Sequence, residues 1–285
     1  EATLAAEVDV VDLFAPTSDA QLDAVLGKSR EEMVEAVQEA ADLAREGGAE
    51  VHLTAMDGFR TEPGKLDDLF GAVDAEWYTI ADTVGSRTPA GVTNFLERLD
   101  TKLDEVGVHF HDDLGVGTAN ALAAGRAGAG KTDVSVGGLG ERAGNTAVEE
   151  LVAATAVGEE PFELDVDEGS LLPVAHQVLE TLGEPVEVTK PLLGEEVFSH
   201  ESGLHTAAML DEPSTFEPFD PARFGGERTL LFGAKSGAGA ARGLLERAGV
   251  EPTEEHVEAL LAELDALEEE VGVDEAVELA ANVDE

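Results

Sequence analysis

Residues 106–115 read Val-Gly-Val-His-Phe-His-Asp-Asp-Leu-Gly and give the first indication of the architecture. A short apolar run passes into two histidines, His109 and His111, that stand two positions apart. Side chains at positions i and i+2 of a strand face the same side. Both imidazoles therefore share one face, whereas Val108 and Phe110 face the surrounding helices. The stretch predicts a buried strand whose end is polar.

Similar apolar runs alternate with amphipathic segments on both sides of this stretch. The predicted strands lie at 8–14, 51–56, 78–83, 106–111 and 132–136, and the predicted helices at 30–45, 66–73, 89–103, 118–127 and 146–157. Such β–α units with short links are typical of a parallel sheet or barrel. Because a TIM barrel has eight of them, we expect either an open α/β sheet or the last five units of a barrel whose first three precede Glu1.

The sequence changes in character after residue 157. We expect the β–α units of 1–157 to form one domain, and 158–285 to be a linker followed by small, mainly helical subdomains. Helices are predicted at 171–182 and 253–271. The glycine-rich segment 233–239 lacks the spacing of a phosphate-binding loop and is interpreted as a turn before a helix.

The charge of the chain limits its partners. With 17 basic and 62 acidic residues the net charge is −45, so nucleic acid and anionic membranes would be repelled. The acids are spread from end to end, which favours a halophilic acidic coat over an acidic interaction segment. The absence of cysteine excludes disulfides and thiolate metal sites. No apolar run approaches the roughly 20 residues of a membrane span, and we expect a cytoplasmic protein.

Polar residues gather at the ends of the predicted strands, where barrels and open α/β sheets carry their catalytic groups. By residue type and spacing His109 and His111 suit a divalent metal ion. Two structural histidines are the alternative for this motif taken alone. Asp112 and Asp113 add carboxylates nearby without deciding between these interpretations.

Two further segments carry candidate groups. Residues 138–145, Gly-Leu-Gly-Glu-Arg-Ala-Gly-Asn, offer an acceptor in Glu141, a donor fork in Arg142 and a neutral oxygen ligand in Asn145. The alternative is a tight turn before a helix. Farther along, His205 lies in a loop-like segment that would present it to a site elsewhere in the protein, or it is a solvated histidine.

Taken together, these motifs resemble the family of homocitrate, 2-isopropylmalate and citramalate synthases, and most closely a homocitrate synthase of halophilic archaeal type that is N-terminally incomplete. The matching stretches follow the family's order along nearly the whole chain. They are 26–30, 81–85, 109–115, 119–120, 138–145 with 149–150, 190–191, 198–205 and 218–221.

The resemblance implies an acyltransferase of amino-acid biosynthesis that condenses acetyl-CoA with a 2-oxo acid in a Claisen-type reaction. It implies that 1–157 is the C-terminal part of a TIM-barrel catalytic domain and that helical subdomains follow it. The metal it implies is a divalent ion, Mg, Mn or Zn, held by His109, His111 and Asn145. It also implies a homodimer, in which the catalytic His205 reaches the partner's barrel. Candidate substrate-binding residues are Thr54, Thr83, Glu141 and Arg142.

Two departures from the family pattern leave alternatives open. The Arg-Asp/Glu-Gly motif of the first barrel strand, which supplies the charged metal ligand, is absent. Met56 stands where the family usually has a catalytic Glu, and the neighbouring Asp57 alternates to the other face. The alternatives are therefore a non-catalytic or regulatory relative, or a metal-dependent C–C lyase.

The net charge of −45 generates a prediction about salt. Self-repulsion among the acidic groups destabilises the folded chain in dilute buffer, and added salt screens that repulsion. We expect the melting temperature, followed by circular dichroism, to rise steadily from low to molar KCl. A melting temperature that stays flat over this range would show that the charge is not a halophilic coat.

Overall fold

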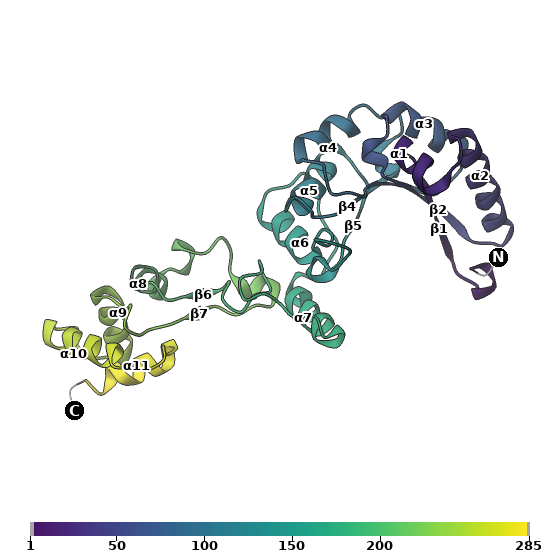
Figure 1. Cartoon of the computed structure of the whole chain (residues 1–285). Helices are drawn as coiled ribbons and strands as arrows, with labels where there is room; N and C mark the ends of the chain where they lie inside the picture. The colour runs from purple at the N-terminus through teal and green to yellow at the C-terminus, as the bar shows by residue number, and fades with distance from the viewer. Residues whose placement is uncertain (1–2, 284–285) are drawn as a thin grey trace. The chain divides into compact units, whose positions relative to one another are not determined.

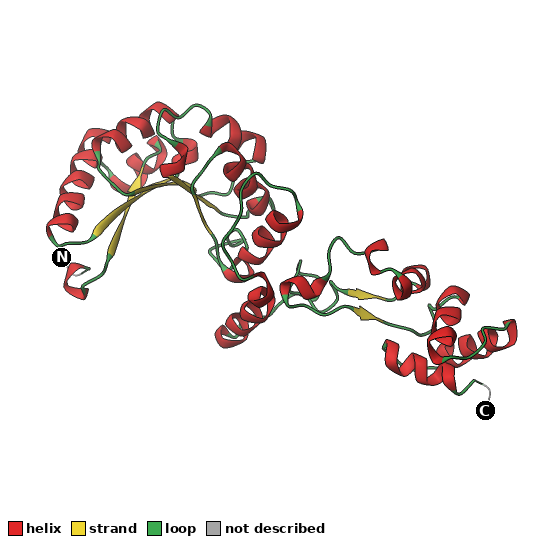
Figure 2. Ribbon diagram, turned by 180° about the vertical axis from the view of Figure 1, so that it is seen from behind, coloured by secondary structure: helices red, strands yellow, loops and turns green. Residues whose placement is uncertain are grey.

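The computed structural model describes residues 3–283, which form two compact units, Glu1–Asp165 and Val166–Glu285. Figures 1 and 2 show the helices and strands of each unit. Each unit has its own hydrophobic core. Along the chain, the boundary between the units falls in the acidic segment that follows residue 157. No helix among the described residues has the length and apolar character needed to cross a membrane.

The first unit is built on a five-stranded parallel sheet whose order follows the sequence. The strands are β1 (Val10–Pro16), β2 (Glu50–Met56), β3 (Trp77–Asp82), β4 (Val106–Phe110) and β5 (Lys131–Asp133). The sheet is curved, and the helices lie on its convex side (Figure 1). The expected α/β architecture with a parallel sheet is confirmed, while its membership of a TIM barrel stays a prediction.

Several helices of this unit begin at residues that suit helix starts. They are α1 (Asp19–Gln21), a π-helical turn (Leu22–Leu26), α2 (Arg30–Glu46), α3 (Pro63–Ala72), α4 (Pro89–Leu96), α5 (Gly117–Ala127) and α6 (Val148–Val157). Ser29 caps α2 in a capping box with Glu32. Proline at the first position of α3 and of α4 matches the missing N–H tolerated there.

Two predicted elements of the first unit are too long. The helix expected at 89–103 ends at Leu96, because the Asp67 carboxylate accepts hydrogen bonds from the backbone N–H groups of Asp100 (3.1 Å) and Thr101 (2.9 Å) and draws the chain out of the helix. The strand expected at 132–136 is only Lys131–Asp133, since the chain then enters a short 3₁₀ turn at Val136–Gly138.

The main core fills the space between the sheet and the helices. Leu53, Ile80 and Phe110 are each 0% exposed and face this core from three neighbouring strands. The Phe59 ring lies 5.2 Å from that of Phe110 and 4.9 Å from that of Phe95. Side chains alternate along a strand. His109, which directly precedes Phe110 on β4, therefore lies on the opposite, concave face of the sheet.

The second unit consists mainly of helices around a second core. Its elements are α7 (Leu171–Leu182), β6 (Ser199–His200), α8 (Gly203–Asp211), β7 (Thr229–Leu230), α9 (Ala238–Ala248), α10 (Glu254–Asp265) and α11 (Val273–Ala281). Short β6 and β7 pair in parallel, which the sequence did not indicate. Gly237 caps α9, which confirms the turn expected before that helix.

The helix expected at 253–271 is also too long. It ends at Asp265, and α11 starts at Val273. Between them Val271 and Phe232 exchange backbone hydrogen bonds of 2.9 and 2.8 Å, which fixes this part of the chain in an extended bridge. A contact between distant residues therefore overrides the local helical pattern.

The core generates a stability prediction. Replacing Phe110 by Ala leaves a cavity between β4 and the helices, so the free energy of unfolding should fall by about 3–5 kcal/mol. Phe14→Ala is the matched control, because the Phe14 side chain is 64% exposed and its loss should cost about 0.5 kcal/mol or less. Urea unfolding of both variants at high salt measures the difference, and equal losses would show that the core is misassigned.

Candidate functional site

The concave face of the sheet brings the two histidines of β4 together. His109 pairs in register with Ala81 of β3 and Asp133 of β5, and His111 follows the end of the strand. The ring centroids of the two histidines lie 5.1 Å apart in an edge-to-face arrangement. Their neighbours Val108 and Phe110 are buried in the core. The two imidazoles therefore lie side by side, away from the helices.

The segment 138–145 brings Asn145 to His111. The two residues form an antiparallel β-bridge, and the Asp112 N–H donates to the Gly144 carbonyl at 2.9 Å. The Asn145 N–H closes the loop by donating to the Gly138 carbonyl at 2.8 Å. Gly144 has a φ of +87°, and a Cβ there would overlap the Gly138 carbonyl oxygen. Glycine is therefore required at this position for the loop to reach His111.

Two polar atoms of this arrangement are buried without a partner. Within residues 3–283, neither His111 Nδ1 nor Asn145 Oδ1 has a hydrogen-bond partner. The Asn145 side-chain N–H donates to the Leu139 carbonyl at 3.1 Å, which orients its oxygen. Burial, aided by the charges of His109 and Arg142, lowers the pKa of His111 against the opposing effects of Asp113 and the Gly144 backbone, which favours the neutral imidazole. An imidazole lone pair and an amide oxygen left unpaired fit a divalent cation.

The donor set lacks a carboxylate. No group of three or more His, Asp or Glu side chains in the described part of the chain is arranged to hold a metal ion. His109, His111 and Asn145 would all be neutral donors, so their attraction for a cation would be weaker than that of a set with one acid.

Asp133 joins this face although the sequence gave no reason to single it out. Its carboxylate lies 3.5 Å from His109 Nδ1 and 3.3 Å from the ammonium of Lys131. Burial pushes the pKa of Asp133 upward, but His109 and Lys131 outweigh it and hold the pKa below its usual range. Finding this neighbour needed the register of β4 against β5, which no local pattern encodes.

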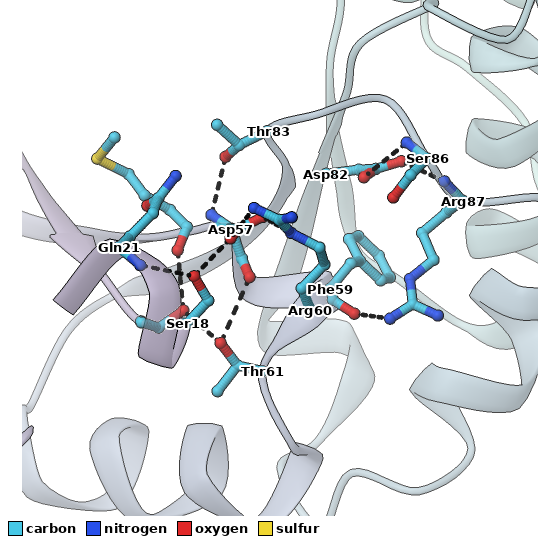
Figure 3. Close-up of polar contacts among 12 residues, drawn as sticks. Ser18, Gln21, Asp57, Phe59, Arg60, Thr61, Asp82, Thr83, Ser86 and Arg87 are labelled. Atoms are coloured by element: carbon cyan, nitrogen blue, oxygen red, sulfur yellow. Dashed lines mark hydrogen bonds and ion pairs between the residues drawn. The ribbon is translucent and has the colours of Figure 1, made fainter. Parts of the chain in front are cut away.

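The loops after β2 and β3 are joined around Asp57 (Figure 3). Asp57 is 1% exposed. Its carboxylate accepts hydrogen bonds from Ser18 Oγ (2.5 Å) and from the guanidinium of Arg60 (2.5 and 2.7 Å). Its backbone N–H donates to the Thr83 hydroxyl at 2.8 Å. Asp57 is therefore engaged in structure, and Thr83 is held at the end of β3.

A second buried acid shapes the same loops. The Asp82 carboxylate accepts hydrogen bonds from the backbone N–H groups of Ser86 (3.1 Å) and Arg87 (2.8 Å), and it is 1% exposed (Figure 3). The Arg87 guanidinium donates to the Phe59 carbonyl, and Asn120 donates to the Arg87 carbonyl at 3.0 Å. These contacts fix the loop that carries Thr83.

The remaining candidates have other surroundings. Thr54 is buried in β2, and its hydroxyl donates to the Asp12 carboxylate at 3.0 and 3.1 Å. The Glu141 side chain is 80% exposed. Arg142 is paired with Asp113, and that contact lowers the pKa of Asp113 and raises that of Arg142. His205 lies in helix α8 and not in the expected loop, because the helix begins directly after Ser202, and its ring stacks on Phe216 with 3.9 Å between ring centroids.

Comparison with known families identifies the fold. The HMGL-like family model matches residues 1–178, and the "homocitrate synthase post-HMGL domain-like" model matches residues 192–271. The chain belongs to the HMGL-like family. The resemblance to homocitrate, isopropylmalate and citramalate synthases is thereby confirmed.

Individual HMGL-like relatives agree with this assignment. Homocitrate synthase AksA of Methanopyrus kandleri is 39% identical over 94% of this chain and 68% of its own length. The putative (R)-citramalate synthase CimA of the same organism is 36% identical over 94% of this chain and 53% of its own length. The HMG-CoA lyase structure from Bacillus subtilis, at 23% identity, has a TM-score of 0.58 over 65% of this chain and 67% of that one, which indicates a common fold.

The Asp57 network generates a prediction. Asp57→Ala removes the acceptor of Ser18 and Arg60, so the free energy of unfolding should fall by about 2 kcal/mol. Asp19→Ala is the control: Asp19 pairs with Arg30 in solvent, with 77% of its side chain exposed, and such pairs contribute about 0–1 kcal/mol. If both variants unfold at the same urea concentration, Asp57 does not hold these loops together.

Proposed function

We propose that this protein is an acyltransferase that condenses acetyl-CoA with a 2-oxo acid, in the manner of the homocitrate, isopropylmalate and citramalate synthases to which it is similar. The observation that carries the proposal is the pair of buried, unpartnered atoms His111 Nδ1 and Asn145 Oδ1 beside His109. A site of this kind at the ends of parallel strands suits small substrates.

In this proposal His109, His111 and Asn145 hold a divalent ion, Mg, Mn or Zn. When bound, such an ion polarises the ketone of a 2-oxo acid. The chain spans 68% and 53% of two relatives it matches. We propose that the first strands of a TIM barrel, with an acidic ligand, lie upstream of residue 1 in the whole protein.

The chain's own residues supply the surroundings of the reaction. A base removes a proton from the thioester methyl group, the resulting carbanion attacks the ketone carbon, and the ketone oxygen takes up a proton. Water then cleaves the thioester and releases CoA. The Thr83 hydroxyl, placed by Asp57, is a candidate for binding the 2-oxo acid. We propose that His205 acts in proton transfer at the site of a partner subunit in a homodimer.

Met56 favours a second candidate function. It shares the face of Thr54 on β2, where a thioether cannot transfer protons, and the neighbouring Asp57 is bound to Ser18 and Arg60. A non-catalytic relative that keeps the fold and the metal site accounts for both facts. Turnover of the whole protein separates the two proposals, because only the acyltransferase releases CoA from acetyl-CoA in the presence of a 2-oxo acid.

The metal site is tested directly by titrating the 285-residue chain with Mn²⁺ or Co²⁺. We expect weak binding, since the proposed donors are neutral. His111→Ala should weaken it further by at least about tenfold, whereas His176→Ala, which removes an exposed histidine of α7, should not. If both variants bind as the unmodified chain does, the proposed ligands are wrong.

Activity gives an independent prediction. When the chain of residues 1–285 is incubated at high salt with acetyl-CoA and any 2-oxo acid, a thiol reagent should detect no released CoA. The proposed site lacks an acidic ligand and an acid–base group at position 56. The protein extended upstream should bind metal more tightly. Turnover by the 285-residue chain alone would contradict this account of what the site needs.

A further inference from the structure

Arg142 connects three loops that each carry one of the proposed site residues. Its guanidinium donates to both carboxylate oxygens of Asp113, at 2.8 Å each, and to the Thr83 carbonyl at 2.9 Å. Thr83 follows β3, Asp113 follows β4 and Arg142 follows β5. A planar fork on a carboxylate is the most directional ion pair that proteins form. One side chain thus spans the ends of three neighbouring strands.

The backbone around this ion pair is shaped to bring the loops together. Arg142 itself has a φ of +58°, a conformation that residues other than glycine rarely adopt. In the loop after β3, Gly85 has a φ of +59°, and a Cβ there would overlap the Asp113 carboxylate. The loop after β3 therefore packs directly on the acid that Arg142 binds, and only glycine permits that approach.

The same ion pair lies next to the proposed metal ligands in the chain. Asp113 is two residues after His111, and Arg142 is three residues before Asn145. Backbone hydrogen bonds continue the connection, because the Asp112 N–H binds the Gly144 carbonyl at 2.9 Å. The fork of Arg142 has its Nε and Nη2 engaged within the protein, while Nη1 lies 3.8 Å from Glu141.

We propose that Arg142 is a positioning residue: by joining Asp113 to the Thr83 carbonyl it sets the distances among His111, Asn145 and Thr83. This extends the metal site proposed above and rests on it. Arg142 then acts through the loops and does not need to touch the 2-oxo acid. A lysine cannot replace it, since a single ammonium cannot bind both carboxylate oxygens and the carbonyl in the same geometry.

The sign of the effect on metal affinity separates this role from plain electrostatics. Removing a cation near a metal site should by charge alone tighten binding of Mn²⁺ or Co²⁺. Loss of positioning should instead weaken it, by about tenfold, as for other groups that orient metal ligands. A substrate contact would leave metal affinity unchanged and weaken only binding of the 2-oxo acid.

The experiment compares Arg142→Gln, Arg142→Lys, Asp113→Asn and the double variant R142Q/D113N in the whole protein by calorimetric titration with Mn²⁺. Arg126→Gln is the matched control, because Arg126 forms a similar fork on Glu160 in the helical layer. We expect both Arg142 variants to lose about tenfold in affinity, the double variant to bind no more weakly than the weaker single one, and the control to be unaffected. Tighter or unchanged binding in Arg142→Gln, or full rescue by lysine, would overturn the proposal.

Amide hydrogen exchange supplies a readout that needs no metal. If Arg142 positions the loops, the N–H groups of Asp112 and Asn145, which donate to Gly144 and Gly138, should exchange at least about tenfold faster in Arg142→Gln and unchanged in Arg126→Gln. If exchange is faster in Arg142→Gln but the unmodified protein binds no metal, the proposed function is rejected while the role of Arg142 in holding the loops stands. Unchanged exchange in Arg142→Gln would overturn the positioning role itself.

Discussion

The alternation of side chains along β4 is the constraint on which the rest of the site depends. Val108 and Phe110 enter the core between sheet and helices, where they are 1% and 0% exposed. Their burial stabilises the unit by removing apolar surface from water. Because the strand cannot slip by one residue without reversing its faces, the same packing holds His109 on the concave side. A hydrophobic constraint thus sets the position of a polar group.

The loops at the ends of the strands are ordered by buried polar contacts instead. Asp57 and Asp82, each 1% exposed, bind an arginine side chain or backbone N–H groups of a loop. These acids differ in purpose from the acidic residues spread over the surface. A buried carboxylate is costly unless its oxygens are bonded, so each one fixes the groups around it. By contrast, His111 Nδ1 and Asn145 Oδ1 are among the buried side-chain atoms of the described residues that have no hydrogen-bond partner.

Much of the fold could be predicted because its signals are local. The strand around His109, the helix that starts after Ser29 and the turn before α9 follow from alternation, capping and glycine placement. The errors came from contacts between distant residues. Asp67 ends α4 early by binding Asp100 and Thr101, and the bridge of Phe232 with Val271 interrupts the last predicted helix.

The residue types of the candidate site could be predicted from the sequence, but the residues that contact them were harder to predict. The spacing of His109 and His111 indicated two candidate donors, and the family resemblance implied Asn145 as a third. The structure places His109 in β4 and bridges His111 to Asn145 just beyond the end of that strand. The register of β4 against β5 places Asp133 beside His109, and a left-handed backbone conformation at Arg142 accompanies its contact with Asp113. No periodicity in the sequence reveals either of these features. Met56 was visible from the sequence, but the engagement of Asp57 by Arg60 and Ser18 needed coordinates.

The central claim is that His109, His111 and Asn145 bind a divalent metal ion. The most direct test is a crystal structure from crystals grown in or soaked with Zn²⁺ or Mn²⁺, with data collected at the absorption edge of the metal. The account predicts an anomalous peak about 2.0–2.2 Å from an imidazole nitrogen of His109 and of His111, with the Asn145 side-chain oxygen turned toward it. A peak bound elsewhere, with both imidazoles free, would contradict it.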